Sequence, residues 1–162
     1  MYKQKSAIIE QIQSYHNQVA ELYKGLYERI EDEKMKSIIH DLYDHEISRE
    51  KYLEKHKKVA TAMNSWLNFS CDKLSDQISE CFKDINTEHD LTMDEIIRIE
   101  MYFDNCLIKL YNILSRENEL SDTATNIFYY MLKKTKKEET ILSNMFYNAN
   151  ANLHERILML NV

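Results

Sequence analysis

Carboxylates, a histidine and two tyrosines stand at matching places in the two halves of this chain, and such side chains can bind a metal ion. The second set follows the first by 88 residues from His16 to Asp104, and by 89 residues from Glu46 to Thr135. Carboxylate oxygens with one imidazole nitrogen suit iron, manganese or zinc. The sequence therefore predicts one interior site built from both halves. The two sets are His16, Tyr23, Glu46 and Arg49, and then Asp104, Tyr111, Thr135 and Glu138.

Two helical hairpins must position these residues. Apolar residues recur every three or four positions over 5–30 and on to 58, and again over 91–116 and 122–148, the spacing of one helical face. Short connections, at 31–33 and 117–121, force each pair of helices to run antiparallel. Thr92 and Glu95 form a capping-box pattern that predicts where the third long helix begins.

Residues 59–90 form a long crossover between the hairpins, and a short amphipathic helix is predicted within it over 72–85. A last short helix is predicted over 152–160. Two repeated hairpins can close around one interior, so we predict a single all-α domain over 1–162, a four-helix bundle. Six crossover residues are expected to pack against its side: Trp66, Leu67, Phe69, Leu74, Ile78 and Phe82.

Composition supports helices and excludes some functions. The chain has one glycine and no proline, so it lacks the turn residues that sheets need. A net charge of −6 argues against nucleic-acid binding. No apolar run is long enough to span a membrane, and no signal peptide is visible. We therefore expect a cytoplasmic protein whose three cysteines, which form no CxxC pair, are reduced thiols.

The register of these residues resembles the rubrerythrin type of ferritin-like protein. That family carries E-x6-Y on one helix and ExxH on the next, and then repeats the pair. Segments 22–36 and 94–111 look like the family's first turn region and third helix. The resemblance implies a ferritin-like four-helix bundle with a di-iron site, and an oxidoreductase acting on peroxide or dioxygen if the protein is active. No rubredoxin-like pair of CxxC motifs accompanies it, so no built-in electron relay is implied.

The family's ligand positions are only partly kept. Glu46 is the one ligand of unchanged type. Three others differ from the pattern but can still coordinate a metal ion: His16, Asp104 and Glu138. Arg49 and Thr135 depart further, because a guanidinium cannot lose its proton to bind metal and a threonine cannot bridge two ions.

Three interpretations of the interior remain, and all concern the carboxylates Glu46, Asp104 and Glu138. In the first, Arg49 pairs with one or more of them and its charge replaces that of a metal. In the second, they hold one iron or manganese ion, with His16 as a nitrogen ligand. Arg49 then contacts one of the carboxylate ligands and fixes its orientation without binding the ion. In the third, a di-iron centre persists.

Other polar residues are assigned lesser roles. Tyr23, Tyr111 and Thr135 are expected beside the site, where the tyrosine hydroxyls bond to carboxylates or simply pack. Glu100 is assigned to the surface or to the same ion-pair network. His45 is about 100° around the helix from the neighbouring site glutamate, so we expect it off that face.

Two functions follow from these alternatives. The first is a divergent rubrerythrin-like metal protein that binds one iron or manganese ion and handles peroxide or dioxygen, or sequesters metal. The second is a metal-free bundle with an internal arginine–carboxylate network, which acts as a structural or protein-interaction module. A homodimer is the expected assembly in either case.

Overall fold

Five α-helices make up the chain in a computed structural model that describes residues 5–61, 71–116 and 122–147. The predicted all-α class is confirmed, although the described helices number five rather than four. The predicted helix over 152–160 lies outside the described residues, as do Trp66, Leu67 and Phe69. The helices are α1 Lys5–Arg29, α2 Glu33–Thr61, α3 Cys71–Phe82, α4 Met93–Ser115 and α5 Asp122–Tyr147.

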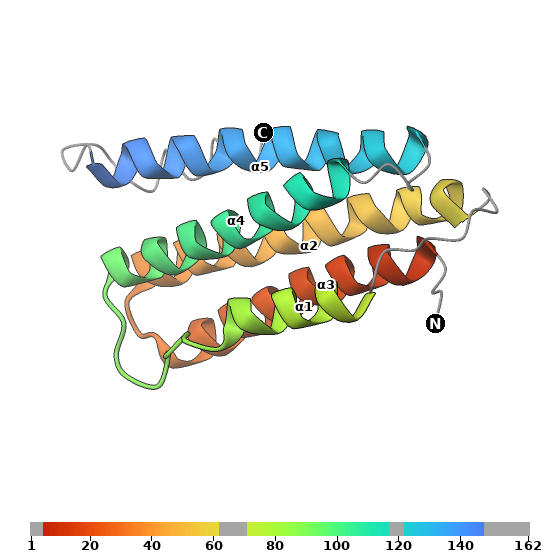
Figure 1. Cartoon of the computed structure of the whole chain (residues 1–162). Helices are drawn as coiled ribbons and strands as arrows, with labels where there is room; N and C mark the ends of the chain where they lie inside the picture. The colour runs from red at the N-terminus through yellow and green to blue at the C-terminus, as the bar shows by residue number, and fades with distance from the viewer. Residues whose placement is uncertain (1–4, 62–70, 117–121, 148–162) are drawn as a thin grey trace.

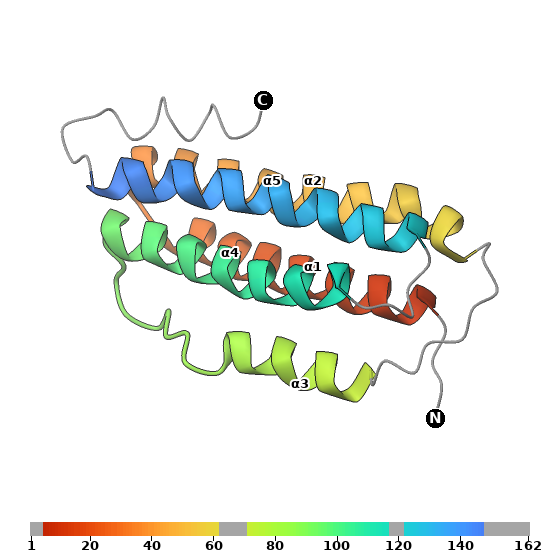
Figure 2. The same cartoon turned by 45° about the horizontal axis from the view of Figure 1, so that its top comes forward.

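The four long helices run side by side as two antiparallel hairpins, α1 with α2 and α4 with α5 (Figure 1). The short helix α3 lies along the outside of this group and contacts α1 and α4 (Figure 2). The crossover thus returns the chain along the length of the bundle before α4 begins. None of the five described helices is long and apolar enough to cross a membrane.

Apolar spacing explains which faces meet. In α1, Ile8, Ile12 and Val19 recur on one face and are at most 1% exposed, and burying such side chains contributes roughly 1.5–3 kcal/mol each. The other helices add similar rows to a continuous core. In α3, the predicted contacts of Leu74 and Ile78 with this core are present.

An aromatic cluster joins α3 to the long helices. The Phe82 ring lies 5.2 Å from Phe103 of α4 and 5.4 Å from Tyr15 of α1, measured between ring centroids. The buried hydroxyl of Tyr15 donates a hydrogen bond of 2.8 Å to the carbonyl oxygen of Phe103. These contacts fix α3, α1 and α4 against one another beside the polar interior.

The ends of the helices follow local capping rules. Asp32 precedes α2, and its Oδ1 accepts a hydrogen bond of 2.8 Å from the backbone N–H of Met35. The predicted capping box at α4 is confirmed. The Thr92 hydroxyl accepts a hydrogen bond from the backbone N–H of Glu95. In return, the Glu95 carboxylate accepts a hydrogen bond of 2.7 Å from the backbone N–H of Thr92.

Replacing Thr92 by alanine should lower the free energy of unfolding by about 1 kcal/mol, because the first turn of α4 loses its hydroxyl acceptor. Urea denaturation followed by circular dichroism measures this change. Thr140→Ala is the matched control. Its exposed hydroxyl donates a hydrogen bond to the Lys136 carbonyl within α5, and alanine has the higher helix propensity, so stability should hold or rise slightly. Equal losses in the two variants would contradict the capping role.

Candidate functional site

A band of polar side chains crosses the middle of the bundle, where the hairpins face each other. All of them are at most 6% exposed although they carry charges or strong hydrogen-bonding groups. Such groups are costly to bury unless they are paired. The band, which we call the polar interior, comprises His16 of α1, His45, Glu46 and Arg49 of α2, Glu100 and Asp104 of α4, and Thr135 and Glu138 of α5, with Tyr23 and Tyr111 beside it.

Arg49 lies at the centre of the polar interior and meets three carboxylates. Its Nη1 is 2.7 Å from Glu46 Oε1, and its Nη2 is 2.6 Å from Glu138 Oε2. Nη2 is also 2.8 Å from Asp104 Oδ1. One guanidinium therefore joins α2, α4 and α5, and it contacts each carboxylate that the sequence named as a partner.

Asp104 is the least satisfied of these groups. Its Oδ1 forms an ion pair of 2.8 Å with Arg49 Nη2. The Oδ2 of this fully buried carboxyl has no hydrogen-bond partner among the described residues. The Nε of Arg49 likewise has none. Buried acceptor oxygens without a donor are rare in proteins, so the unpaired oxygen of Asp104 is one that a ligand could contact.

His16 is brought to the polar interior as predicted, but both of its ring nitrogens are engaged. Nδ1 lies 2.7 Å from Glu46 Oε2, and Nε2 lies 3.1 Å from the Tyr111 hydroxyl. The ring therefore orients Glu46 and has no nitrogen free for a metal ion. His16 therefore contacts Glu46 and Tyr111 and is not a member of the group of carboxyl oxygens described below.

His45 was wrongly placed by the sequence analysis. It is 6% exposed, and its Nε2 lies 3.2 Å from Glu138 Oε2. The angle from Glu46 was a poor guide, because the inward face of α2 is wide enough to meet both α1 and α5. A better signal is that His45 precedes Arg49 by four residues, which places both on one side of a helix.

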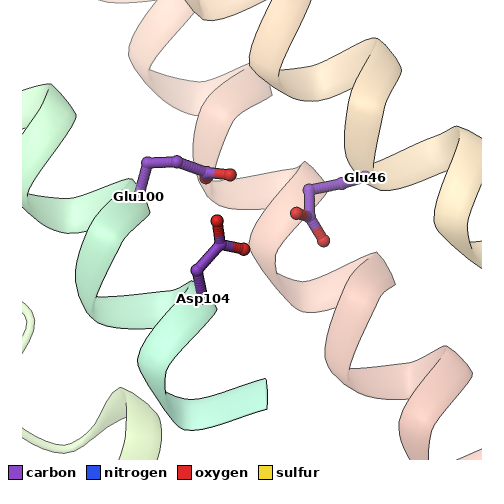
Figure 3. A group of neighbouring side chains, drawn as sticks. All are labelled: Glu46, Glu100 and Asp104. Carbon is purple, nitrogen blue, oxygen red and sulfur yellow. The ribbon is translucent and has the colours of Figure 1, made fainter. Parts of the chain in front are cut away.

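Three carboxyl groups converge beside Arg49, one from α2 and two from α4 (Figure 3). One oxygen each of Glu46, Glu100 and Asp104 lies within 4.8 Å of the other two. We call this group the carboxylate cluster. Glu100 is 1% exposed and accepts a hydrogen bond from the Tyr23 hydroxyl. Its position four residues before Asp104 already placed it on the same helical face.

The remaining predicted residues lie in the polar interior with separate roles. Glu138 is held by Arg49 and His45 and is not a member of the carboxylate cluster. Thr135 is 1% exposed, and its hydroxyl has no hydrogen-bond partner among the described residues. Tyr111 bonds to His16, so only Tyr23 reaches a carboxylate.

Two of the carboxylates are stabilised in the ionised form. Burial alone would raise the pKa of Glu46, but the charge of Arg49 and the His16 ring outweigh it and lower the pKa to about 2. Burial opposes ionisation of Glu138 as well. The hydrogen bond from His45 and the charge of Arg49 prevail there and lower its pKa to about 2.

The other two carboxyl groups hold protons more tightly than usual. Burial raises the pKa of Asp104 to about 7, against the attraction of Arg49. Burial and the neighbouring charges of Asp104 and Glu46 raise the pKa of Glu100 well above its ordinary value. The carboxylate cluster therefore contains exchangeable protons close to one carboxylate that is already ionised.

Such a cluster can exchange protons for a cation, or it can remain protonated around Arg49. Oxygen-only ligands suit hard or borderline ions such as Mn²⁺ and Fe²⁺. Arg49 is a fixed positive charge at the edge of the carboxylate cluster, which opposes a second ion.

The chain matches no family model, no curated protein and no solved structure.

Proposed function

We propose that this protein is a divergent ferritin-like bundle that binds one iron or manganese ion at the carboxylate cluster. Glu46, Glu100 and Asp104 would hold the ion. The hydrogen bonds of His16 to Glu46 and of Tyr23 to Glu100 would keep these two ligands in position. The ion would provide a Lewis acid and a redox centre in a site that excludes bulk water. The structure contributes three converging oxygens and a surrounding set of hydrogen bonds.

The observation that carries the proposal is the convergence of three carboxyl oxygens on a group with unused acceptors. Oxygens within 4.8 Å of one another lie close enough to share one ion. Both oxygens of Asp104 are buried, and its Oδ2 has no hydrogen-bond partner among the described residues. A cation would satisfy this oxygen, whereas the ion pair with the guanidinium is made by Oδ1.

Charge balance also favours one ion and no more. The pKa values of Glu46 and Glu138 are lowered to about 2 around Arg49, whereas burial raises the pKa of Glu100 and raises that of Asp104 to about 7. A divalent ion that displaces one proton each from Glu100 and Asp104 would leave the net charge of the polar interior unchanged, so no further charge would be buried. A second ion would add charge beside a guanidinium that cannot leave.

The helix arrangement supports the ferritin-like assignment. Two antiparallel hairpins face each other around a polar interior, as that kind of bundle requires. Their contacts cross between the repeats in both directions. Tyr23 of the first repeat bonds to Glu100 in the second, and Tyr111 of the second bonds to His16 in the first.

Titration of the metal-free protein with Mn²⁺ at about pH 6 should show one ion per chain and the release of about two protons per ion, because the ion replaces protons on Glu100 and Asp104. Isothermal calorimetry in buffers of different ionisation enthalpy counts the protons. The Glu100→Gln, Asp104→Asn double variant should bind Mn²⁺ more than about 100-fold less tightly. Glu139→Gln, which changes a neighbouring carboxylate outside the cluster, should bind as the wild type does.

The Arg49→His variant extends the test. Removal of the fixed charge should tighten Mn²⁺ binding, since the ion no longer faces a guanidinium. Two ions per chain in the wild-type protein would contradict the assigned role of Arg49. If the folded wild-type protein binds no Mn²⁺ or Fe²⁺, the metal proposal is wrong.

A second function is favoured by the ion pairs of Arg49. Contacts of 2.6–2.8 Å to three buried carboxylates give the polar interior a cation of its own. In this proposal the bundle is a metal-free scaffold that binds a protein, with a second copy of itself as the first candidate. Tyr129 and Tyr130, adjacent on α5 and about half exposed, offer a contact surface. A concentration-dependent dimer that Tyr129→Ser, Tyr130→Ser abolishes would support it.

A further inference from the structure

We propose that Cys81 and Cys106 form a peroxide-sensitive dithiol, whose oxidation to a disulfide ties the outer helix α3 to α4. Cys81 lies near the end of α3 and Cys106 in the middle of α4. Both are free thiols and each is 7% exposed. Neither belongs to the proposed metal ligands, so this inference does not rest on the metal proposal.

The two thiols are direct neighbours. The thiols of Cys81 and Cys106 lie close enough to interact electrostatically with each other, and the Cys81 sulfur also lies 3.3 Å from the carbonyl oxygen of Gln77. Cys106 also interacts with Tyr102, which is 38% exposed. The sulfurs thus lie at the rim of the α3–α4 contact, close to the surface of the protein.

The surrounding rings keep the sulfurs together. Phe82, next to Cys81 in sequence, packs against Phe103 with a centroid distance of 5.2 Å. Tyr15 packs against both rings and holds the Phe103 carbonyl at 2.8 Å. Once one of these sulfurs has been oxidised, the other, held beside it, reacts with it far faster than a thiol in solution would.

The chemistry needs one oxidant, and hydrogen peroxide supplies it. One cysteine sulfur attacks a peroxide oxygen and the O–O bond breaks. This cysteine becomes a sulfenic acid, and one water molecule leaves. The second sulfur then attacks the first, the S–O bond breaks, and a second water leaves. In total, two thiols and one peroxide give one disulfide and two waters; the thiols lose two electrons and the peroxide gains them.

The test uses the full chain carrying Cys71→Ser, so that Cys81 and Cys106 are the only cysteines. A small excess of hydrogen peroxide in chelator-containing buffer should remove the mass of two hydrogen atoms. Dithiothreitol should restore that mass. Tryptic mapping should identify a peptide pair linked through Cys81 and Cys106. The melting temperature of the oxidised form should rise by about 5–10 °C, because the bond closes a loop from α3 to α4.

Variants that retain one of the two thiols complete the design. With Cys71→Ser, Cys106→Ser or Cys71→Ser, Cys81→Ser, peroxide should add oxygen and leave the melting temperature without this rise. Circular dichroism checks that each variant is folded. Addition of oxygen to the Cys71→Ser protein without loss of hydrogen would overturn the proposal, and so would disulfides formed only between chains.

Discussion

Replacement of Arg49 by methionine should lower the free energy of unfolding by about 3–5 kcal/mol at pH 7, the range expected when one partner of a buried ion pair is removed. Methionine fills a similar volume, so little of this loss comes from a cavity. The loss arises because Glu46 and Glu138 are left ionised and buried without their cation. Urea denaturation of the metal-free protein measures the change.

Lys83→Met is the control for Arg49→Met. Lys83 is 65% exposed on its side chain and lies 3.5 Å from Glu80, so its removal should cost less than about 0.5 kcal/mol. A loss in Arg49→Met no larger than that of the control would show that the guanidinium does not balance the polar interior.

The loss of Arg49 should also change the sign of the pH dependence contributed by Glu46 and Glu138. Their pKa values of about 2 lie below the ordinary 4.5. In the wild-type protein their contribution to stability is therefore present above pH 4.5 and is lost as the pH falls towards 2. Without the guanidinium, we expect burial to outweigh the remaining contacts with His16 and His45, so that both pKa values rise above the ordinary value. The Arg49→Met protein should consequently be more stable at about pH 4 than at about pH 8.

Asp104→Asn should become progressively more stable than the wild-type protein as the pH rises. The folded pKa of Asp104 is about 7 and its ordinary value is 3.8, so the folded wild-type chain binds the extra proton and loses stability between these values. One pKa unit corresponds to about 1.4 kcal/mol. The difference in unfolding free energy between variant and wild type should therefore shift by roughly 4 kcal/mol from about pH 4 to about pH 8, as an upper estimate.

Asp94→Asn is the matched control for this pH series. Asp94 is exposed in the first turn of α4, so its replacement should change the free energy of unfolding only slightly. A constant difference between Asp104→Asn and the wild type would contradict the raised pKa. Saturating Mn²⁺ should stabilise the wild type and not Asp104→Asn, because an ion that binds only the folded state stabilises it by RT ln(1 + [Mn²⁺]/Kd).

The helices and the inward faces could be predicted from the sequence because they depend on local rules. Apolar spacing placed α1, α2, α4 and α5 within three residues of their observed ends. The capping box at Thr92 and Glu95 was equally local. The repeat then set the register between the hairpins, and it placed Arg49 and Glu138 in one interior although 89 residues separate them.

The composition of the carboxylate cluster could not be predicted in the same way. Glu100 and Asp104 share a face of α4, but only the packing of α1 brings the Tyr23 hydroxyl to Glu100. His45 could not be placed from its angle to Glu46 alone, because that angle does not say which neighbouring helix each side of α2 meets. These assignments depend on the lateral positions of four helices, which the repeat spacing leaves undetermined.

The contact between Arg49 and Glu138 also decides which hairpin can associate with which. These residues occupy equivalent positions of the two repeats, 89 residues apart, and they meet at 2.6 Å. If two copies of α1–α2 paired in the same manner, two guanidiniums would face each other; two copies of α4–α5 would bring two carboxylates together. Burial of either like-charged pair is strongly unfavourable. The divergence of this one position therefore makes each half complementary to the other and incompatible with itself, so a duplicated sequence still closes within a single chain.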